Sequence, residues 1–145
     1  MEAKSPKEEC EELMNSLLPL AKRMLSENRE FYPYGGFMKP LGEIVHIGAK
    51  IEGTDHPKSA PLIDLLRETF REQALKSECK AVAILFDVKI KPPGAAEKSD
   101  AIQACLDHRE DYSVEVLFPY SINADGEVIY GKPFAQRGGG LIFSK

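Results

Sequence analysis

Between residues 79 and 134, apolar residues recur at every second position, and this period constrains the fold more than any other feature of the sequence. Successive side chains of a β-strand point to opposite faces of a sheet, so such alternation indicates strands. It predicts four strands, over residues 79–91, 100–108, 112–122 and 127–134. Residues 81–86 are apolar at consecutive positions, which predicts a central strand that is covered on both faces.

The positions of the apolar residues also predict how the last three strands pair. Their apolar residues lie at even positions. The apolar side chains of two paired strands lie on the same face of the sheet only if the numbers of paired residues sum to an even value. A three-residue loop, Arg109–Asp111, meets this condition and pairs Leu106 with Val114 and His108 with Tyr112. Asp111 then takes the left-handed conformation that such a loop requires.

The next hairpin follows the same rule. A loop over residues 124–126 pairs Ile122 with Val128 and Tyr120 with Tyr130, and it places Gly126 in the left-handed position. Two hairpins with the same class of loop predict an antiparallel meander.

Two other segments have the period of a helix. Residues 5–28 carry an apolar stripe and begin with Ser5 and Pro6, a pair typical of a helix start. Pro19 lacks an amide proton, which predicts a kink or a split near Ser16. Residues 59–77 carry a second stripe. Between the helices, strands are expected at residues 34–38 and 43–51.

These elements predict one globular domain, residues 1–145, of the α+β class. The expected architecture is a two-layer sandwich, with a mostly antiparallel sheet of about five or six strands and two helices on one face. The order is helix, two strands, helix and four strands.

Composition excludes several classes of function. The net charge of −4, with lysines and arginines scattered among carboxylates, argues against nucleic acid. No apolar run approaches the ~20 residues that span a membrane. The three cysteines are odd in number and lack CxxC spacing, which argues against disulfides and a zinc site. Free thiols and a charged N-terminus predict a cytoplasmic protein.

The stretch ACLDHRED places Cys105, Asp107, His108 and Arg109 close together, as a reactive centre would. In a regular strand, however, Cys105 and His108 point to opposite faces, so the thiol and imidazole cannot form a catalytic pair. Glu115 is expected opposite Cys105, where its charge would raise the pKa of the thiol. The stretch is therefore interpreted as the charged end of a hairpin, and no catalytic residue is assigned.

Neither a metal nor a cofactor is expected. His46, His56 and His108 lack the spacing of a ligand set, with or without Asp55 or Asp107. The glycines of YPYGG and RGGG are followed by no helix that would bind a nucleotide phosphate.

Two groups of side chains are candidates for binding. Aromatic residues cluster at positions 31–37 and along the hairpins, and such side chains line pockets and interfaces. Polar residues are expected to share an outward sheet face, namely His46, Lys50, Asp87, Lys89, Asp107, Arg109, Ser113 and Glu115. The candidate ligand- or partner-binding residues are Tyr32, Tyr34, Phe37, His46, Asp107, His108, Arg109, Tyr112, Glu115 and Tyr120.

These observations favour a non-enzymatic protein-binding module, such as a small inhibitor or an immunity-type partner. One alternative is a small-ligand sensor or carrier, with a pocket among Tyr32, Tyr34, Phe37 and the hairpin aromatics. Another is an enzyme that uses Cys105 or His108. A second copy of the chain is a further possible partner.

Overall fold

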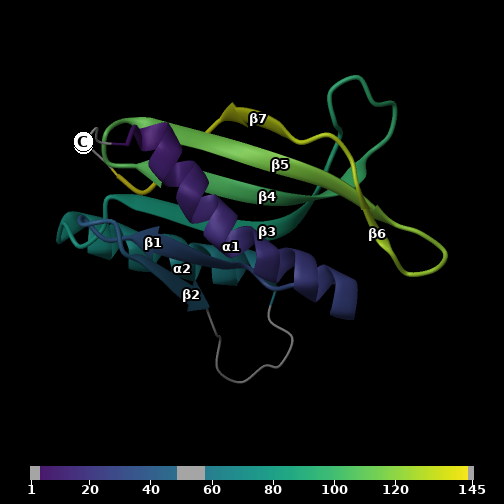
Figure 1. Cartoon of the computed structure of the whole chain (residues 1–145), viewed down its shortest axis with the longest axis horizontal. Helices are drawn as coiled ribbons and strands as arrows, with labels where there is room; N and C mark the ends of the chain where they lie inside the picture. Colours follow the sequence, from purple (N-terminus) through teal and green to yellow (C-terminus); the bar gives the residue numbers. More distant parts are fainter. Residues whose placement is uncertain (1–3, 49–57, 144–145) are drawn as a thin grey trace.

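A seven-stranded antiparallel sheet forms the centre of the protein, with one helix on each face (Figure 1). The computed structural model describes residues 4–48 and 58–143. The elements in chain order are α1 (Pro6–Asn28), β1 (Tyr34–Met38), β2 (Ile44–Gly48), α2 (Ser59–Leu75), β3 (Ala81–Ile90), β4 (Ser99–His108), β5 (Tyr112–Ile122), β6 (Val128–Tyr130) and β7 (Phe134–Arg137). The expected α+β class and the order of the elements are confirmed.

The strands lie in the order β2-β1-β3-β4-β5-β6, and β7 also pairs with β5. Both predicted hairpin registers are confirmed: Leu106 pairs with Val114, and Ile122 pairs with Val128. Asp111 has a φ of 62° and Gly126 a φ of 83°, the left-handed conformations that the two loops require. Short loops therefore determine the pairing from β4 to β6.

The expectation that both helices lie on one face of the sheet is wrong. Two adjacent glycines of β1 show this, because adjacent residues of a strand face opposite sides. A Cβ on Gly35 would lie 3.1 Å from the Phe70 ring of α2, and a Cβ on Gly36 would lie 3.1 Å from Leu17 of α1. Each helix thus packs directly against the β1 backbone from its own side, and the protein has three layers rather than two.

The central strand β3 explains why both faces need a helix. Its residues Ala81, Ala83 and Leu85 are buried in the core beneath α1. Its residues Val82, Ile84 and Phe86 are buried in the core beneath α2. Both helices have an apolar stripe, and the sequence pattern alone cannot say which stripe belongs to which face.

The single outward polar face that the sequence predicted does not form. Val82 of β3 pairs with Asp107 of β4, so odd positions of β3 share a face with even positions of β4. Asp87 and Lys89 therefore lie on the α1 side, whereas Asp107, Ser113 and Glu115 lie on the α2 side. The long loop between β3 and β4 leaves their register undetermined by local rules. Lys50 lies outside the described residues, as do Asp55 and His56.

The segment expected as one strand over residues 127–134 is instead divided. β6 ends at Tyr130, and β7 begins at Phe134 after a break that contains Pro133. Proline cannot donate a hydrogen bond to a neighbouring strand, so it favours such a break. The division gives seven strands instead of the expected five or six. Residues 138–143 then cross the α2 side, where Ile142 is buried.

Helix α1 is continuous through Pro19, so the predicted split at Ser16 does not occur. Its start is as predicted, since Ser5 and Glu8 form a reciprocal capping box. The hydroxyl of Tyr34 accepts a hydrogen bond from the Ala21 amide at 2.9 Å and donates one to the Leu17 carbonyl. These two backbone groups bond each other in a regular helix, so the hydroxyl bridges the helix beside the proline. Neither helix in the described part of the chain has the length and apolar character to cross a membrane.

Candidate functional site

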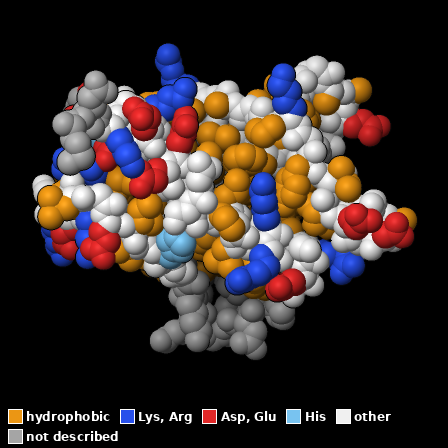
Figure 2. All heavy atoms as spheres, in the orientation of Figure 1, with side chains coloured by type: hydrophobic (Ala, Val, Ile, Leu, Met, Phe, Trp, Pro, Cys, Tyr) orange, Lys and Arg blue, Asp and Glu red, His pale blue; other side chains and the backbone are white. Residues whose placement is uncertain are grey.

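A groove between α1 and β5, hereafter the α1–β5 groove, is the main candidate site. Its volume is ≈430 Å³, within the range of about 300–1,000 Å³ that small-molecule sites occupy. Its floor is mainly apolar, and Figure 2 shows hydrophobic side chains gathered over this face. The lining residues are Lys7, Glu11, Met14 and Asn15 of α1, Leu106 of β4, Tyr112, Val114 and Val116 of β5, and Pro133, Phe134 and Ala135 at the start of β7.

The groove exists because one helix is too narrow to cover the sheet. A helix is about 10 Å wide, roughly the spacing of two to three strands. Helix α1 packs mainly on β1, β3 and β4. Val114, Val116 and Phe118 of β5 face the same side, and they remain half-buried at the edge of the core. The uncovered part of the sheet face therefore becomes an apolar floor beside α1.

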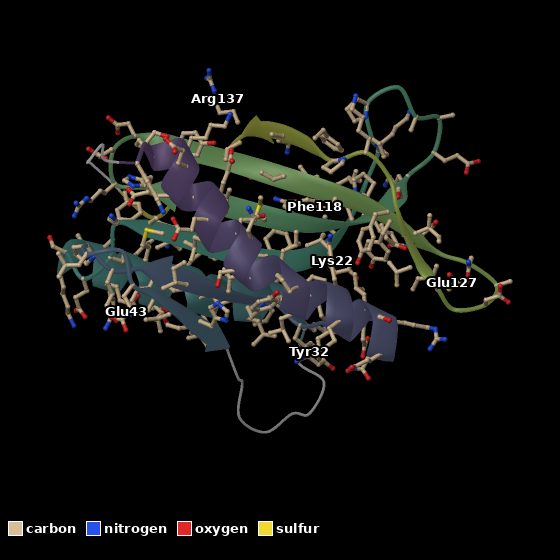
Figure 3. The ribbon with its side chains drawn as sticks, viewed as in Figure 1. Lys22, Tyr32, Glu43, Phe118, Glu127 and Arg137 are labelled. Atoms are coloured by element: carbon tan, nitrogen blue, oxygen red, sulfur yellow. The ribbon has the colours of Figure 1, made fainter. Side chains whose placement is uncertain are left out.

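Two lysines of α1 differ in their surroundings on this face. Lys7 lines the groove, and its ammonium lies 3.9 Å from the Glu11 carboxylate, whereas Lys22 lies beyond the lining residues. Toward the other end of α1, Lys22 Nζ lies 4.9 Å from the centre of the Tyr130 ring. Figure 3 shows Lys22 and Phe118 close together on this face. The Tyr130 hydroxyl is buried and has no hydrogen-bond partner among the described residues.

A buried polar cluster joins Glu9, Lys80 and His108 on the α1 side. The His108 Nε2 atom lies 3.0 Å from Glu9 Oε1, and the Lys80 ammonium contacts Glu9 Oε2. His108 Nδ1 accepts the Glu110 amide at 3.1 Å, which places the ring proton on Nε2. Burial opposes the charge of Glu9, but hydrogen bonds from Lys80 and His108 lower the pKa of its carboxyl. Both ring nitrogens are occupied, so the cluster is structural in character.

A second polar group lies on the α2 side beneath residues 138–142. It contains Arg67, Cys105, Asp107, Ser113 and Glu115 around a small cavity. Burial raises the pKa of Asp107, although a hydrogen bond with Ser113 opposes the rise. Burial also raises the pKa of the Cys105 thiol to about 11, against a hydrogen bond from Gln103. Since His108 contacts α1 on the opposite face, the predicted separation of thiol and imidazole is confirmed.

The structure does not bring the predicted aromatic residues together in one pocket. Tyr34 is buried beneath α1, whereas Phe37 packs on Phe70 of α2, with ring centres 6.3 Å apart. Tyr120 is buried and donates a hydrogen bond to Asp87 at 2.8 Å. Tyr32 is 37% exposed and lies away from Phe118 (Figure 3).

The remaining candidates are also dispersed. His46 Nε2 lies 2.8 Å from the Ser16 hydroxyl oxygen of α1, and Arg109 is an exposed loop residue. Glu115 accepts a hydrogen bond from Gln136 at 2.7 Å on the α2 side. All ten candidates lie in the described part of the chain, and one of them, Tyr112, lines the α1–β5 groove.

Sequence reasoning missed the walls of the groove. The apolar even positions of β5 were readable from the sequence and supply the floor. Nothing in the sequence pattern shows that Met14 and Asn15 line the same groove as Pro133 and Ala135, because that depends on where α1 crosses the sheet.

No family model matches this sequence, and no curated protein or solved structure matches the chain. Within the described residues, no three His, Cys, Asp or Glu side chains lie close enough together to hold a metal ion. The fold and the site define an α+β protein with an antiparallel sheet, a helix on each face and an open apolar groove. Its function is therefore inferred from the geometry of that groove.

Proposed function

We propose that this protein is a non-enzymatic binding domain that holds a small apolar ligand in the α1–β5 groove. The observation that carries the proposal is a concave space of ≈430 Å³ with a mainly apolar floor. Apolar pockets of this size with a few polar groups at the rim are typical of ligand sites. Lys7, Glu11 and Asn15 supply the polar rim.

The chemistry of the other polar groups supports binding rather than catalysis. A nucleophilic cysteine needs a lowered pKa, whereas burial raises the pKa of Cys105 to about 11. His108 has both ring nitrogens engaged by Glu9 and Glu110, so neither is free to accept a proton from a substrate. The three free thiols also support a cytoplasmic location as part of this proposal.

Titration with Nile red, a neutral apolar dye, tests the groove directly. The wild-type protein is expected to bind the dye and to raise its fluorescence. Ala135→Trp fills the groove from an exposed position and should weaken binding at least about tenfold, since the added ring occupies the ligand's volume.

Gln136→Trp is the matched control. Gln136 is adjacent in β7, but it faces Glu115 on the opposite side of the sheet, so its replacement should leave dye binding unchanged. Absence of binding by the wild-type protein, or equal binding by Ala135→Trp, would rule out the proposal.

A segment of a partner protein is the second candidate occupant, as for an inhibitor or an immunity-type partner. The observation that favours it is the open mouth of the groove, which Figure 2 shows as an apolar surface facing solvent. Such a surface can receive apolar side chains of another chain, including a second copy of this one.

A photocrosslinking residue at Asn15, an exposed residue of α1 that lines the groove, tests this second candidate. It should give one defined adduct in the cells that express the protein, and Nile red should compete for that site. A crosslinker at Gln136 is the control. Sedimentation equilibrium of the purified protein distinguishes a second copy from a different partner, because only self-association raises the mass.

A further inference from the structure

On the basis of the proposed function, we infer that the ligand of the α1–β5 groove is a neutral amphiphile, such as an aliphatic alcohol, whose hydroxyl lies between Tyr112 and Glu11. Its apolar tail points along β5 towards Pro133 and Ala135. All four of these residues line the groove.

Lys7, Glu11 and Tyr112 gather at one end of the groove. Glu9, in the first turns of α1, contacts His108, which pairs with Tyr112 at the start of β5. Lys7 and Glu11 lie about 3 Å from Glu9 along the helix axis, at a rise of about 1.5 Å per residue. They therefore lie at the Tyr112 end of the groove, and all three residues line it.

The other end of the groove has an apolar lining. There Val116 of β5 pairs with Ala135 of β7, and Pro133 lies beside them, whereas the polar side chain of Asn15 is exposed at the rim. Tyr112 and Val116 are separated by about 13 Å along β5, from a rise of about 3.3 Å per residue. A groove that is polar at one end and apolar at the other favours an amphiphile that lies lengthwise over the valines of β5.

The charges at the polar end favour a headgroup without charge. Among the described residues that line the groove, Lys7 and Glu11 are ionic, and their opposite charges lie 3.9 Å apart. A carboxylate would be attracted by one of them and repelled by the other, and the same holds for an ammonium. Moving an ion out of water without an unmatched countercharge is costly, whereas an alcohol loses little.

The Tyr112 hydroxyl is the hydrogen-bond donor of this end. It makes no hydrogen bond within the part of the chain that the structure describes, and its side chain is half-buried. Burial raises the pKa of Tyr112, and the nearby charge of Glu11 raises it further, so the hydroxyl keeps its proton at neutral pH. An alcohol can accept a hydrogen bond from Tyr112 and donate one to Glu11, whereas an ionised carboxylate can only accept.

Isothermal titration calorimetry with octanol and heptyl methyl ether tests the headgroup, each ligand being kept below its solubility limit. The two molecules are isomers, but only octanol can donate a hydrogen bond. Octanol is expected to bind about tenfold more tightly, the effect of one hydrogen bond to a carboxylate. Octanoate and octylamine, which are charged at pH 7, should each bind at least about tenfold more weakly than octanol.

Substitutions at the polar end test the two contacts separately. Tyr112→Phe removes a hydroxyl that bonds no described residue, so the fold is retained. It should weaken the binding of octanol and of the ether alike, about three- to tenfold, because both accept a hydrogen bond.

Glu11→Ala should abolish the preference for octanol over the ether. It should also strengthen octanoate binding, because the charge of Lys7 is then unmatched. Glu12→Ala is the matched control, since Glu12 is the next residue of α1, is also exposed and does not line the groove. It should change the binding of none of these ligands.

The outcomes distinguish a neutral headgroup from the proposed function alone. Equal binding of octanol and its ether isomer, tighter binding of octanoate than of octanol, or no effect of Tyr112→Phe would refute the headgroup at Tyr112 and Glu11. If Ala135→Trp still blocked Nile red in that case, the groove would remain a binding site for an apolar ligand. If Nile red also failed to bind, both proposals would fall.

Discussion

His108 Nε2 lies 3.0 Å from the carboxylate of Glu9, a residue of the first turns of α1. Lys80, which directly precedes β3, contacts the other oxygen of the same carboxylate. One buried charge thus joins α1 to the ends of two central strands. Because the charge has two hydrogen-bonding partners in the folded protein, its contribution to stability depends on pH.

Glu9→Gln should lower the free energy of unfolding by about 1.5–3 kcal/mol at neutral pH, the range for hydrogen bonds to a charged group. The pKa of Glu9 is lowered from 4.5 by folding, despite the opposing effect of burial. Its stabilisation is therefore complete above pH 4.5 and is lost as the pH falls through the lower pKa of the folded state. Urea unfolding of both proteins at pH 7 and pH 3 measures this change.

The difference between wild type and Glu9→Gln should accordingly shrink at pH 3. Glu43→Gln is the control, since the exposed Lys39–Glu43 pair should contribute no more than about 1 kcal/mol. A difference for Glu9→Gln that is as large at pH 3 as at pH 7 would show that the carboxylate charge is not its source.

Gly35→Ala should destabilise the protein by about 1–3 kcal/mol, because overpacking forces the backbone or the helices apart. The added Cβ would lie 2.4 Å from the Ala83 carbonyl oxygen, which cannot move freely within the sheet. Gly48→Ala is the matched control in β2, where a Cβ has no described atom within 4 Å. Thermal unfolding should give Gly35→Ala the lower melting temperature, and equal melting temperatures would contradict the close approach of the Ala83 carbonyl and Phe70 to Gly35.

Phe86→Ala should lower the free energy of unfolding by about 3–5 kcal/mol, the usual cost of emptying a buried aromatic site. Phe86 is 8% exposed and belongs to the core beneath α2. Leu41 is fully exposed in the turn after β1, so Leu41→Ala should change stability by less than about 0.5 kcal/mol. Chemical denaturation measures both, and a loss below about 1 kcal/mol for Phe86→Ala would place this side chain outside the core.

The three thiols of the folded protein should react slowly with Ellman's reagent at neutral pH. Burial raises the pKa of Cys10 to about 12 and those of Cys79 and Cys105 to about 11. At pH 7, each cysteine is then in its reactive thiolate form in roughly one molecule in ten thousand or fewer. Reaction in the native state should be at least about a hundredfold slower than in urea. Rapid modification of Cys105 alone would instead support an enzyme.

Local sequence rules predicted the β4–β5 and β5–β6 hairpins to the residue, including the left-handed Asp111 and Gly126. A three-residue loop leaves few ways to join two strands, so alternation and turn chemistry determine the register. The pairing of β3 with β4 could not be obtained in this way, since the loop between Ile90 and Ser99 is long. The expected polar face was wrong for that reason.

The candidate site, too, could be predicted from the sequence only in part. Tyr112 was predicted as a binding residue and does line the groove, together with apolar positions of β5 that the alternation revealed. Tyr34, Phe37 and Tyr120 were also predicted as binding residues, but their side chains are buried in the core. A buried aromatic residue and a ligand-binding one look alike in a sequence, because both are large, apolar and placed on strands.

The sequence by itself determined the two helices, the strands up to β5 and the two hairpins, because alternation, capping and turn residues act over a few neighbouring positions. Only the tertiary structure decided that α1 and α2 cover opposite faces and that β5 stays partly open beside α1. One helix spans only two or three strands of a sheet, and its position follows from the packing of residues far apart in the chain. The groove is the part of the sheet that this packing leaves uncovered.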